Sequence, residues 1–179
     1  GLYPDSAGGG IFYGTVNSAT LSNCIITRNS SSYGGGIYLN NSSTYLINCY
    51  ITNNSSYDGG GVSCDSSSPT LNICTITNNS ASSRGGAMEC SYSSPVLTSC
   101  LIKDNSSPKG SSLFCVGSST PELTNCTIAG NYGGEGDGIY CYGYYTAPKM
   151  SNCILRNSSP EIYVRIGSQP LINYTCIQG

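Results

Sequence analysis

The sequence has very little charge, and it contains no histidine and no tryptophan. Charged residues make up 9% of the chain, whereas an ordinary globular domain has about a quarter. The net charge of −2 provides no basic surface, so nucleic acid is not an expected partner. No apolar run approaches the roughly 18 residues that cross a bilayer, so membrane insertion is not expected either.

In place of charge the sequence has glycine, serine, asparagine and tyrosine, together with an apolar pattern that returns at a fixed spacing. Hydrophobic residues reach 38%, which argues against disorder. The segment GGGIFY recurs in modified form, with copies that start near residues 8, 34, 59, 85, 110, 136 and 159. A second motif of the LSNCIITRN type follows each copy. Repeats of such even length predict one repeat domain over residues 1–179.

A spacing of about 25 residues fits the leucine-rich repeat or the β-helix. The LxxLxLxxN core of leucine-rich repeats is absent, and the segments between motifs are rich in Ser, Gly, Pro and β-branched residues that disfavour helix. Short alternating runs such as Ile37-Tyr38-Leu39 predict strands instead. Strands this short bury apolar area only by stacking on the next coil. The sequence therefore predicts an all-β parallel β-helix (β-solenoid) of seven coils.

Stacking aligns each repeat position into a column along the solenoid axis. Two columns are apolar and form the predicted core: Ile11, Ile37, Val62, Met88, Leu113, Ile139 and Ile162, and Leu21, Leu46, Leu71, Leu97, Leu123 and Met150. A third column is Asn29, Asn54, Asn79, Asn105, Asn131 and Asn157. Asparagine tolerates left-handed backbone, and its amide can bond to the amide one coil away. We therefore expect a buried Asn ladder at one turn, and glycine with positive φ at another.

The GGGI and GGAM segments, followed by IxxN and by strands of the NCTIT type, resemble the right-handed β-helix repeats of secreted bacterial proteins. They are similar to the GGA(I/L/V) and FxxN repeats of polymorphic outer-membrane adhesins, with Ile in place of Phe. The closing LINYTCIQG resembles the last coil of such arrays. The resemblance implies a right-handed β-helix and an extracellular or cell-surface location. It does not specify function, because the class serves adhesion, surface coats and polysaccharide processing.

The eleven cysteines fall into two columns, Cys24, Cys49, Cys74, Cys100, Cys126, Cys153 and Cys176, and Cys64, Cys90, Cys115 and Cys141. Neighbouring thiols lie a whole coil apart and histidine is absent, so a zinc site is not expected. Stacked Cα atoms about 4.8 Å apart are within reach of a disulfide, but columns of seven and four cannot both pair completely. We expect a ladder of buried free thiols, with disulfide staples as the alternative.

Catalysis on a β-helix would need carboxylates clustered on one face, or Ca²⁺ with a basic residue. The nine acidic residues scatter over different columns. One column alone gathers several charges, Asp58, Arg84, Lys109 and Glu135. Pairing along it predicts two exposed ion pairs worth under about 1 kcal/mol each. We therefore expect no catalytic residue, no metal and no cofactor, and a polysaccharide-active enzyme is the least favoured function.

Ten Asn-X-Ser/Thr sequons occur in the sequence. Those in the predicted ladder, at Asn29, Asn54, Asn105 and Asn157, are expected to be buried. The better glycosylation candidates are Asn41, Asn53, Asn78 and Asn173.

Outward aromatic residues share one column, Phe12, Tyr38, Phe114, Tyr140 and Tyr163, interrupted at Ser63 and Glu89. We expect these rings to stack on one another along the sheet. Tyr142, Tyr144 and Tyr145 enrich the sixth coil and are candidates for stacking on sugar rings. An adhesive or carbohydrate-binding module that contacts surface glycans is therefore the second hypothesis.

The repeat shows no capping segment at either end, although an open solenoid end exposes core and strand edges. The predicted end layers consist of Ile11, Leu21 and Cys24, and of Ile162, Leu171 and Cys176. Counted from Cys176 into a second copy, the step to Gly8 equals one of the internal steps from cysteine to glycine turn. We therefore expect head-to-tail stacking of the chain on itself. The first hypothesis is a non-enzymatic extracellular structural solenoid, either a filament subunit or an excerpt of a longer surface fibre.

Overall fold

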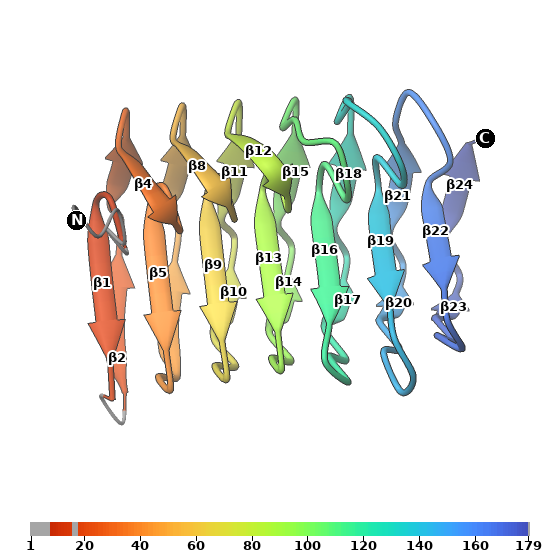
Figure 1. Cartoon of the computed structure of the whole chain (residues 1–179), viewed down its shortest axis with the longest axis horizontal. Coiled ribbons are helices and arrows are strands. Elements are labelled where there is room, and N and C mark those ends of the chain that lie inside the picture. Colours follow the sequence, from red (N-terminus) through yellow and green to blue (C-terminus); the bar gives the residue numbers. More distant parts are fainter. Residues whose placement is uncertain (1–7, 16–17, 179) are drawn as a thin grey trace, which may run out of the picture.

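The computed structural model describes residues 8–15 and 18–178, so residues 1–7, 16–17 and 179 of the predicted domain lie outside the described part. The described chain is a parallel β-solenoid (Figure 1). Each coil adds one strand to each of three seven-stranded sheets. The predicted all-β solenoid of seven coils is confirmed. Within the described ranges no helical segment has the length and apolar character that crossing a membrane would require.

Three long sheets form the walls of the solenoid, and every strand pair in them is parallel. Sheet 1 contains β1 (Ile11–Gly14), β5 (Ile37–Asn40), β9 (Val62–Asp65), β13 (Met88–Ser91), β16 (Leu113–Val116), β19 (Ile139–Tyr142) and β22 (Ile162–Arg165). Sheet 2 contains β2 (Ala19–Ser22), β6 (Thr44–Ile47), β10 (Thr70–Asn72), β14 (Val96–Thr98), β17 (Glu122–Thr124), β20 (Lys149–Ser151) and β23 (Leu171–Asn173). Sheet 3 contains β3 (Ile25–Thr27), β7 (Tyr50–Thr52), β11 (Thr75–Thr77), β15 (Leu101–Lys103), β18 (Thr127–Ala129), β21 (Ile154–Arg156) and β24 (Cys176–Gln178).

A short fourth sheet leads into sheet 1 in the first half of the solenoid (Figure 1). Its strands are β4 (Ser30–Tyr33), β8 (Ser55–Asp58) and β12 (Ser80–Arg84). The register of β12 against β8 shifts between Ala81 and Arg84, because one extra residue bulges out of β12. This bulge places Arg84 opposite Asp58 and thereby builds the site described below.

The interior is one continuous apolar core. Inward side chains of the internal coils, such as Ile37, Leu71 and Ile102, are fully buried. Both predicted apolar columns belong to this core, and Ile11 and Ile162 pack against its two ends as partly buried residues. Burial of one such side chain is worth about 1.5–3 kcal/mol, and each coil contributes several. Stacking therefore stabilises strands that are too short to be stable alone.

Two residues of the last coil lie outside the columns predicted for them. Met150 pairs with Ile172, so Ile172 continues the core column and Leu171 faces outward. Ile154 pairs with Cys176, so Cys176 is exposed and Thr175 follows Cys153 instead. A slip of one residue turns every side chain of a strand to the other face, which explains both errors. This slip also removes the predicted match of the repeat spacing across the junction between two copies. The step to Gly8 of a second copy, counted from Thr175 instead of Cys176, is longer by one position, and no internal step from cysteine to glycine turn has that length.

Left-handed backbone occurs one residue earlier than predicted for the Asn ladder. The residues that precede the ladder positions have φ between 54° and 64°: Arg28, Asn53, Asn78, Asp104 and Gly130. A second left-handed column precedes the cysteine column: Asn23, Asn48, Ile73, Ser99, Asn125 and Asn152. The predicted glycine turn is present, since Gly34 and Gly59 have φ of 58° and 66°. A Cβ at Gly34 would lie 2.2 Å from the Ile37 carbonyl oxygen, so no larger residue fits there.

Candidate functional site

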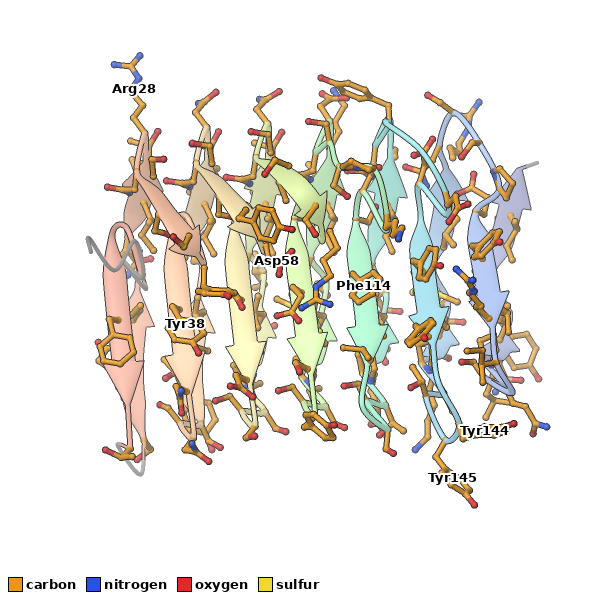
Figure 2. All side chains as sticks on the ribbon, viewed as in Figure 1. Arg28, Tyr38, Asp58, Phe114, Tyr144 and Tyr145 are labelled. Atoms are coloured by element: carbon orange, nitrogen blue, oxygen red, sulfur yellow. The ribbon has the colours of Figure 1, made fainter. Side chains whose placement is uncertain are left out.

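The outer face of sheet 1 carries two columns of outward side chains, and it is the face that Figure 2 presents to the viewer. The first column is Phe12, Tyr38, Ser63, Glu89, Phe114, Tyr140 and Tyr163. The second column is Gly14, Asn40, Asp65, Ser91, Val116, Tyr142 and Arg165. Parallel pairing in register aligns these residues, so each column has one member per coil.

The aromatic residues of the first column stack on one another as predicted. The ring centroids of Phe114 and Tyr140 lie 5.1 Å apart, and those of Tyr140 and Tyr163 lie 4.9 Å apart. Phe12 and Tyr38 form a similar pair at 5.7 Å. Phe114 and Tyr140 are buried by this stacking. The two ring stacks are therefore structural, and a charged cluster occupies the interruption between them.

Arg84 is the centre of that cluster. Its Nη2 atom lies 3.1 Å from Asp58 Oδ2 and 3.8 Å from Glu89 Oε1. The Arg84 guanidinium also lies 5.2 Å from the centroid of the Phe114 ring. Asp58 and Glu89 are each only 3–4% exposed. The predicted Asp58–Arg84 ion pair forms, but it is not the simple exposed pair that was expected, because its carboxylate is buried and a second carboxylate joins it.

The other predicted ion pair does not form. Lys109 and Glu135 face each other on adjoining coils, but only their backbones pair. Both side chains are exposed, and the ion pairs of the described residues join other groups. Among the residues that the structure describes, Lys109 is thus an exposed cation without a carboxylate partner.

The surroundings of Glu89 in the cluster disfavour its ionised form. Burial raises the pKa of Glu89 to about 7, and the neighbouring carboxylates Asp58 and Asp65 add to this rise. A hydrogen bond from Ser63 and the charge of Arg84 lower the pKa only in part. Within the described part of the chain, Asp58 Oδ1 and Arg84 Nε are buried without a hydrogen-bond partner. The cluster is therefore incompletely satisfied, which is unusual for buried polar atoms.

Two hollows flank Arg84 on this face. The first, which we call the acidic slot, has a volume of about 310 Å³ and is lined by Tyr33, Tyr38, Ser63, Asp65, Arg84 and Glu89. The second, which we call the cationic hollow, has a volume of about 290 Å³ and is lined by Arg84, Lys109, Phe114, Tyr140, Tyr142 and Arg165. In Figure 2, Asp58 lies between Tyr38 and Phe114 along the solenoid axis. The face therefore changes from acidic to basic along the axis.

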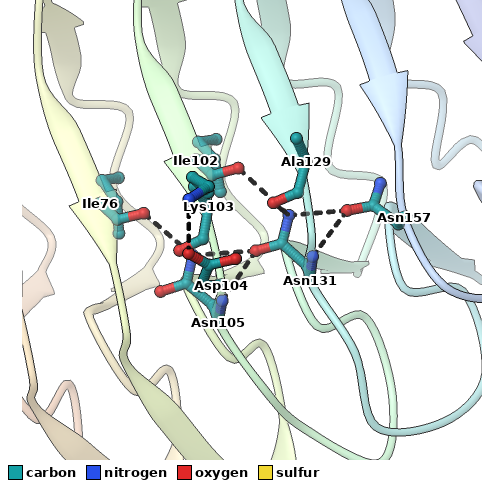
Figure 3. Close-up of polar contacts among 8 residues, drawn as sticks. All are labelled: Ile76, Ile102, Lys103, Asp104, Asn105, Ala129, Asn131 and Asn157. Carbon is teal, nitrogen blue, oxygen red and sulfur yellow. Dashed lines mark hydrogen bonds and ion pairs between the residues drawn. The ribbon is translucent and has the colours of Figure 1, made fainter.

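The Asn column has the contacts of the predicted ladder (Figure 3). Asn79 accepts hydrogen bonds from the backbone N–H and the side-chain amide of Asn54, and it donates likewise to Asn105. The internal members Asn54, Asn79, Asn105 and Asn131 are at most 1% exposed. The end members Asn29 and Asn157 are only partly buried, contrary to the expectation for their sequons. Asn157 donates to the Glu161 carboxylate, which ends the ladder.

A second polar ladder was not predicted. Ser42, Ser67 and Ser93 each donate a backbone N–H to the hydroxyl of the serine one coil on, at 2.9–3.0 Å. The ladder consists of Ser42, Ser67, Ser93 and Ser119, and all four residues are buried. The signal was available in the sequence, because these serines recur once per coil at the same spacing as the asparagine column. This recurrence does not stand out in the sequence, because serine is abundant at the neighbouring positions.

The remaining predicted sites lie on the surface or in the core. The glycosylation candidates Asn41, Asn53, Asn78 and Asn173 are all exposed. All eleven cysteines are free, which fits the predicted thiol ladder, although Cys176 stands outside it. The Cys74 thiol donates to the carbonyls of Leu46 and Asn72 at 3.4 and 3.5 Å. Burial raises the pKa of the Cys64 thiol far above its usual range. Within the described ranges, no group of three or more Cys, Asp or Glu residues is placed to hold a metal ion.

Comparison with known proteins identifies the fold family. No curated protein and no solved structure matches the chain significantly. A family model described as a right-handed β-helix region matches residues 5–143, which is well over half of the chain. The match agrees with the parallel solenoid and with the resemblance of the GGGI and NCTIT repeats. The chain therefore belongs to the right-handed β-helix family.

Proposed function

We propose that the chain is a non-enzymatic structural β-solenoid of the cell exterior that stacks head to tail on further copies of itself. The last coil carries this proposal. Val164, Ile172 and Ile177 are 46%, 36% and 43% exposed. The residues that precede them in the same columns, one coil earlier, are fully buried. The last coil thus exposes apolar side chains at positions that the internal coils bury.

The first coil of a second copy is the proposed partner of this layer. Its inward residues Tyr13 and Leu21 are likewise only partly buried. Contact would add strands β1, β2 and β3 to the three sheets and would pair their edge backbone groups. Such a contact joins two different surfaces, and its repetition gives an open filament rather than a closed ring. The Asn ladder does not contribute to the contact, because Glu161 already receives the donors of Asn157.

A matched pair of lysine substitutions tests this proposal. Ile172→Lys places a charge in the apolar layer, whereas Leu171→Lys places it on the outward face of the same strand. The wild-type chain and Leu171→Lys should form unbranched fibres in electron micrographs, and their mass in light scattering should grow with concentration. Ile172→Lys should remain a short rod with an unchanged circular dichroism spectrum. A wild-type chain that stays monomeric at high concentration would contradict the proposal.

The buried cluster supports a non-enzymatic role. Asp58 and Glu89 both contact the guanidinium of Arg84, which is the arrangement of a structural ion-pair cluster. The exposure of the four glycosylation candidates supports the extracellular part of the proposal, since a glycosylation acceptor must be accessible.

The cationic hollow favours a second candidate function, binding of an acidic glycan. Arg84, Lys109 and Arg165 are three of the seven cations of the chain, and all three line this hollow. The Arg165 guanidinium lies 5.9 Å from the centroid of the Tyr142 ring, whose edge remains exposed. Cations beside aromatic rings suit a sugar that carries an anionic group.

Affinity electrophoresis in gels with an acidic or a neutral polysaccharide tests this second candidate. The wild-type chain should be retarded by the acidic polymer, and the double substitution of Lys109 and Arg165 by Gln should abolish the retardation. Substitution of Arg28 and Arg156 by Gln removes two exposed cations outside the hollow and is the matched control. If both double variants lose retardation equally, the retardation depends on net charge alone and the hollow is not a binding site.

A further inference from the structure

We propose that the acidic slot binds an organic ammonium group, such as that of a lysine side chain or an amino sugar. The slot lies where the aromatic column lacks a ring. Tyr38 precedes Ser63 in the column and Glu89 follows it, and the small, buried Ser63 side chain belongs to the lining of the slot. This inference is independent of fibre formation and of the cationic hollow.

Aromatic rings form one wall of the slot. The Tyr33 and Tyr38 rings lie 6.1 Å apart at a tilt of 35° and both face the slot. Burial raises the pKa of Tyr38, and the hydrogen bond that Asn40 donates to the Tyr38 hydroxyl offsets this rise only in part, so this ring stays neutral. A cation placed against the face of a neutral aromatic ring is attracted by its quadrupole.

Carboxylates form the opposite wall. Glu89 and Asp65 line the slot, and Asp58 lies behind them against Arg84. Two carboxylates thus contact the Arg84 guanidinium, and Asp65 adds a third carboxylate to the lining of the slot. Asp58 is 3% exposed, and its Oδ1 atom has no hydrogen-bond partner among the described residues. Above pH 7, where Glu89 ionises, the carboxylates of the cluster outnumber its guanidinium, which favours a cationic ligand and disfavours an anionic one.

The shape of the slot selects an organic cation over a metal ion. The carboxylates do not converge as a metal site in the described part of the chain. Two tyrosines belong to the lining, and the volume of about 310 Å³ exceeds what a bare ion requires. An alkylammonium group can place its charge beside Glu89 and Asp65 and its methylene groups against Tyr38.

Nuclear magnetic resonance titration with matched ligands tests the proposal. The probes are N-acetyl-lysine methylamide and glucosamine, and their neutral counterparts are the Nζ-acetylated lysine derivative and N-acetylglucosamine. The charged probes should shift the amide signals of Ser63 and Ser91 saturably, with a Kd on the order of 1–10 mM. The better of the two charged probes distinguishes a peptide source from a sugar source. Neutral probes that bind equally well would overturn the proposal.

Variants at the slot separate shape from charge. Ser63→Tyr should fill the space with a ring and abolish binding. Ser63→Thr keeps the hydroxyl that donates to Glu89 and adds only one methyl group, so it should retain binding. Glu89→Gln and Asp65→Asn should each weaken binding roughly fivefold or more. Glu135→Gln removes an exposed carboxylate outside the slot and should have no effect. Undiminished binding by folded Ser63→Tyr, or the absence of saturable shifts in the wild-type chain, would refute the slot.

Discussion

Ser63 on β9 lies directly across the parallel ladder from Glu89 on β13, and its hydroxyl donates a 2.9 Å hydrogen bond to Glu89 Oε2. These two residues interrupt a column that is otherwise aromatic. Stacked rings bury apolar area on both sides of these two residues. Between the two ring stacks, the buried carboxylate of Glu89 takes the place of a ring. A buried carboxylate is costly unless it is neutral or well paired. The arrangement therefore makes the stability of the solenoid depend on pH.

Glu89→Gln should remove that pH dependence. The pKa of Glu89 is raised from 4.5 to about 7, mainly by burial. The pKa of Glu89 is higher in the folded state than in the unfolded state, so protonation of Glu89 favours folding. This contribution to stability is complete below pH 4.5 and is lost as the pH rises through 7. Between pH 4 and pH 8, the stability of Glu89→Gln should improve relative to the wild-type chain by roughly 2–3 kcal/mol.

Urea denaturation at several pH values measures this difference. Glu135→Gln is the control, since it removes a carboxylate that is exposed rather than buried. If the difference between Glu89→Gln and the wild-type chain stays constant with pH, Glu89 does not titrate as described.

Loss of one ladder amide should destabilise the solenoid strongly. Asn79→Ala removes the acceptor for two donors of Asn54 and the donor to the Ile51 carbonyl. Buried groups left unpaired cost about 1–3 kcal/mol in unfolding free energy, as chemical denaturation would show. Ser80→Ala, at the exposed next residue, should cost less than about 0.5 kcal/mol. Equal effects of the two substitutions would contradict the ladder.

The coil architecture was predictable from sequence because each repeat position has the same structural role in every coil. Ile37, Leu71 and Asn79 stand in columns whose members share size and polarity. Register followed from the motif spacing in every coil but the last. There the coil is short, and Leu171 and Cys176 matched their motifs in type while lying one residue away from the columns. Sequence type alone could not detect that slip.

The full Arg84 cluster was not predictable for a different reason, although its Asp58–Arg84 pair was. Its carboxylates come from separate columns, and only the bulge in β12 brings Arg84 between Asp58 and Glu89. The extra residue was visible because this coil is longer by one position than the coil before it, but its place within the coil was not. Burial of Asp58 depends on the short sheet, whose serine-rich strands carry no apolar alternation. A search along single columns therefore found the Asp58–Arg84 pair but not the contact of Arg84 with Glu89.

Alkylation should rank the cysteines by burial. In the native state, iodoacetamide should modify exposed Cys176 first and half-buried Cys24 more slowly, while the nine buried thiols stay protected. Denaturation without reductant should then expose all eleven thiols to the reagent, as mass spectrometry can count. Four or more disulfides in that experiment would show that the columns are cross-linked staples.

Ile73→Asn should stabilise the protein. Ile73 has a φ of 55° and is 57% exposed, so it bears the strain of a left-handed conformation with little burial in return. A β-branched residue is a genuine outlier in that region, whereas asparagine adopts it readily. The same column has asparagine at Asn48 and Asn125, with φ of 50° and 56°. The gain should be about 0.5–1 kcal/mol in unfolding free energy, measured by urea denaturation.

Ile47→Asn provides the control for this last prediction, because Ile47 is also exposed but lies within strand β6. Asparagine is unfavourable in a strand, so this substitution should be neutral or destabilising. A gain at Ile73 alone would establish that the improvement comes from backbone strain and not from removal of an exposed apolar side chain. If Ile73→Asn destabilises the chain, the exposed isoleucine makes a contribution to the folded state that its burial does not reveal.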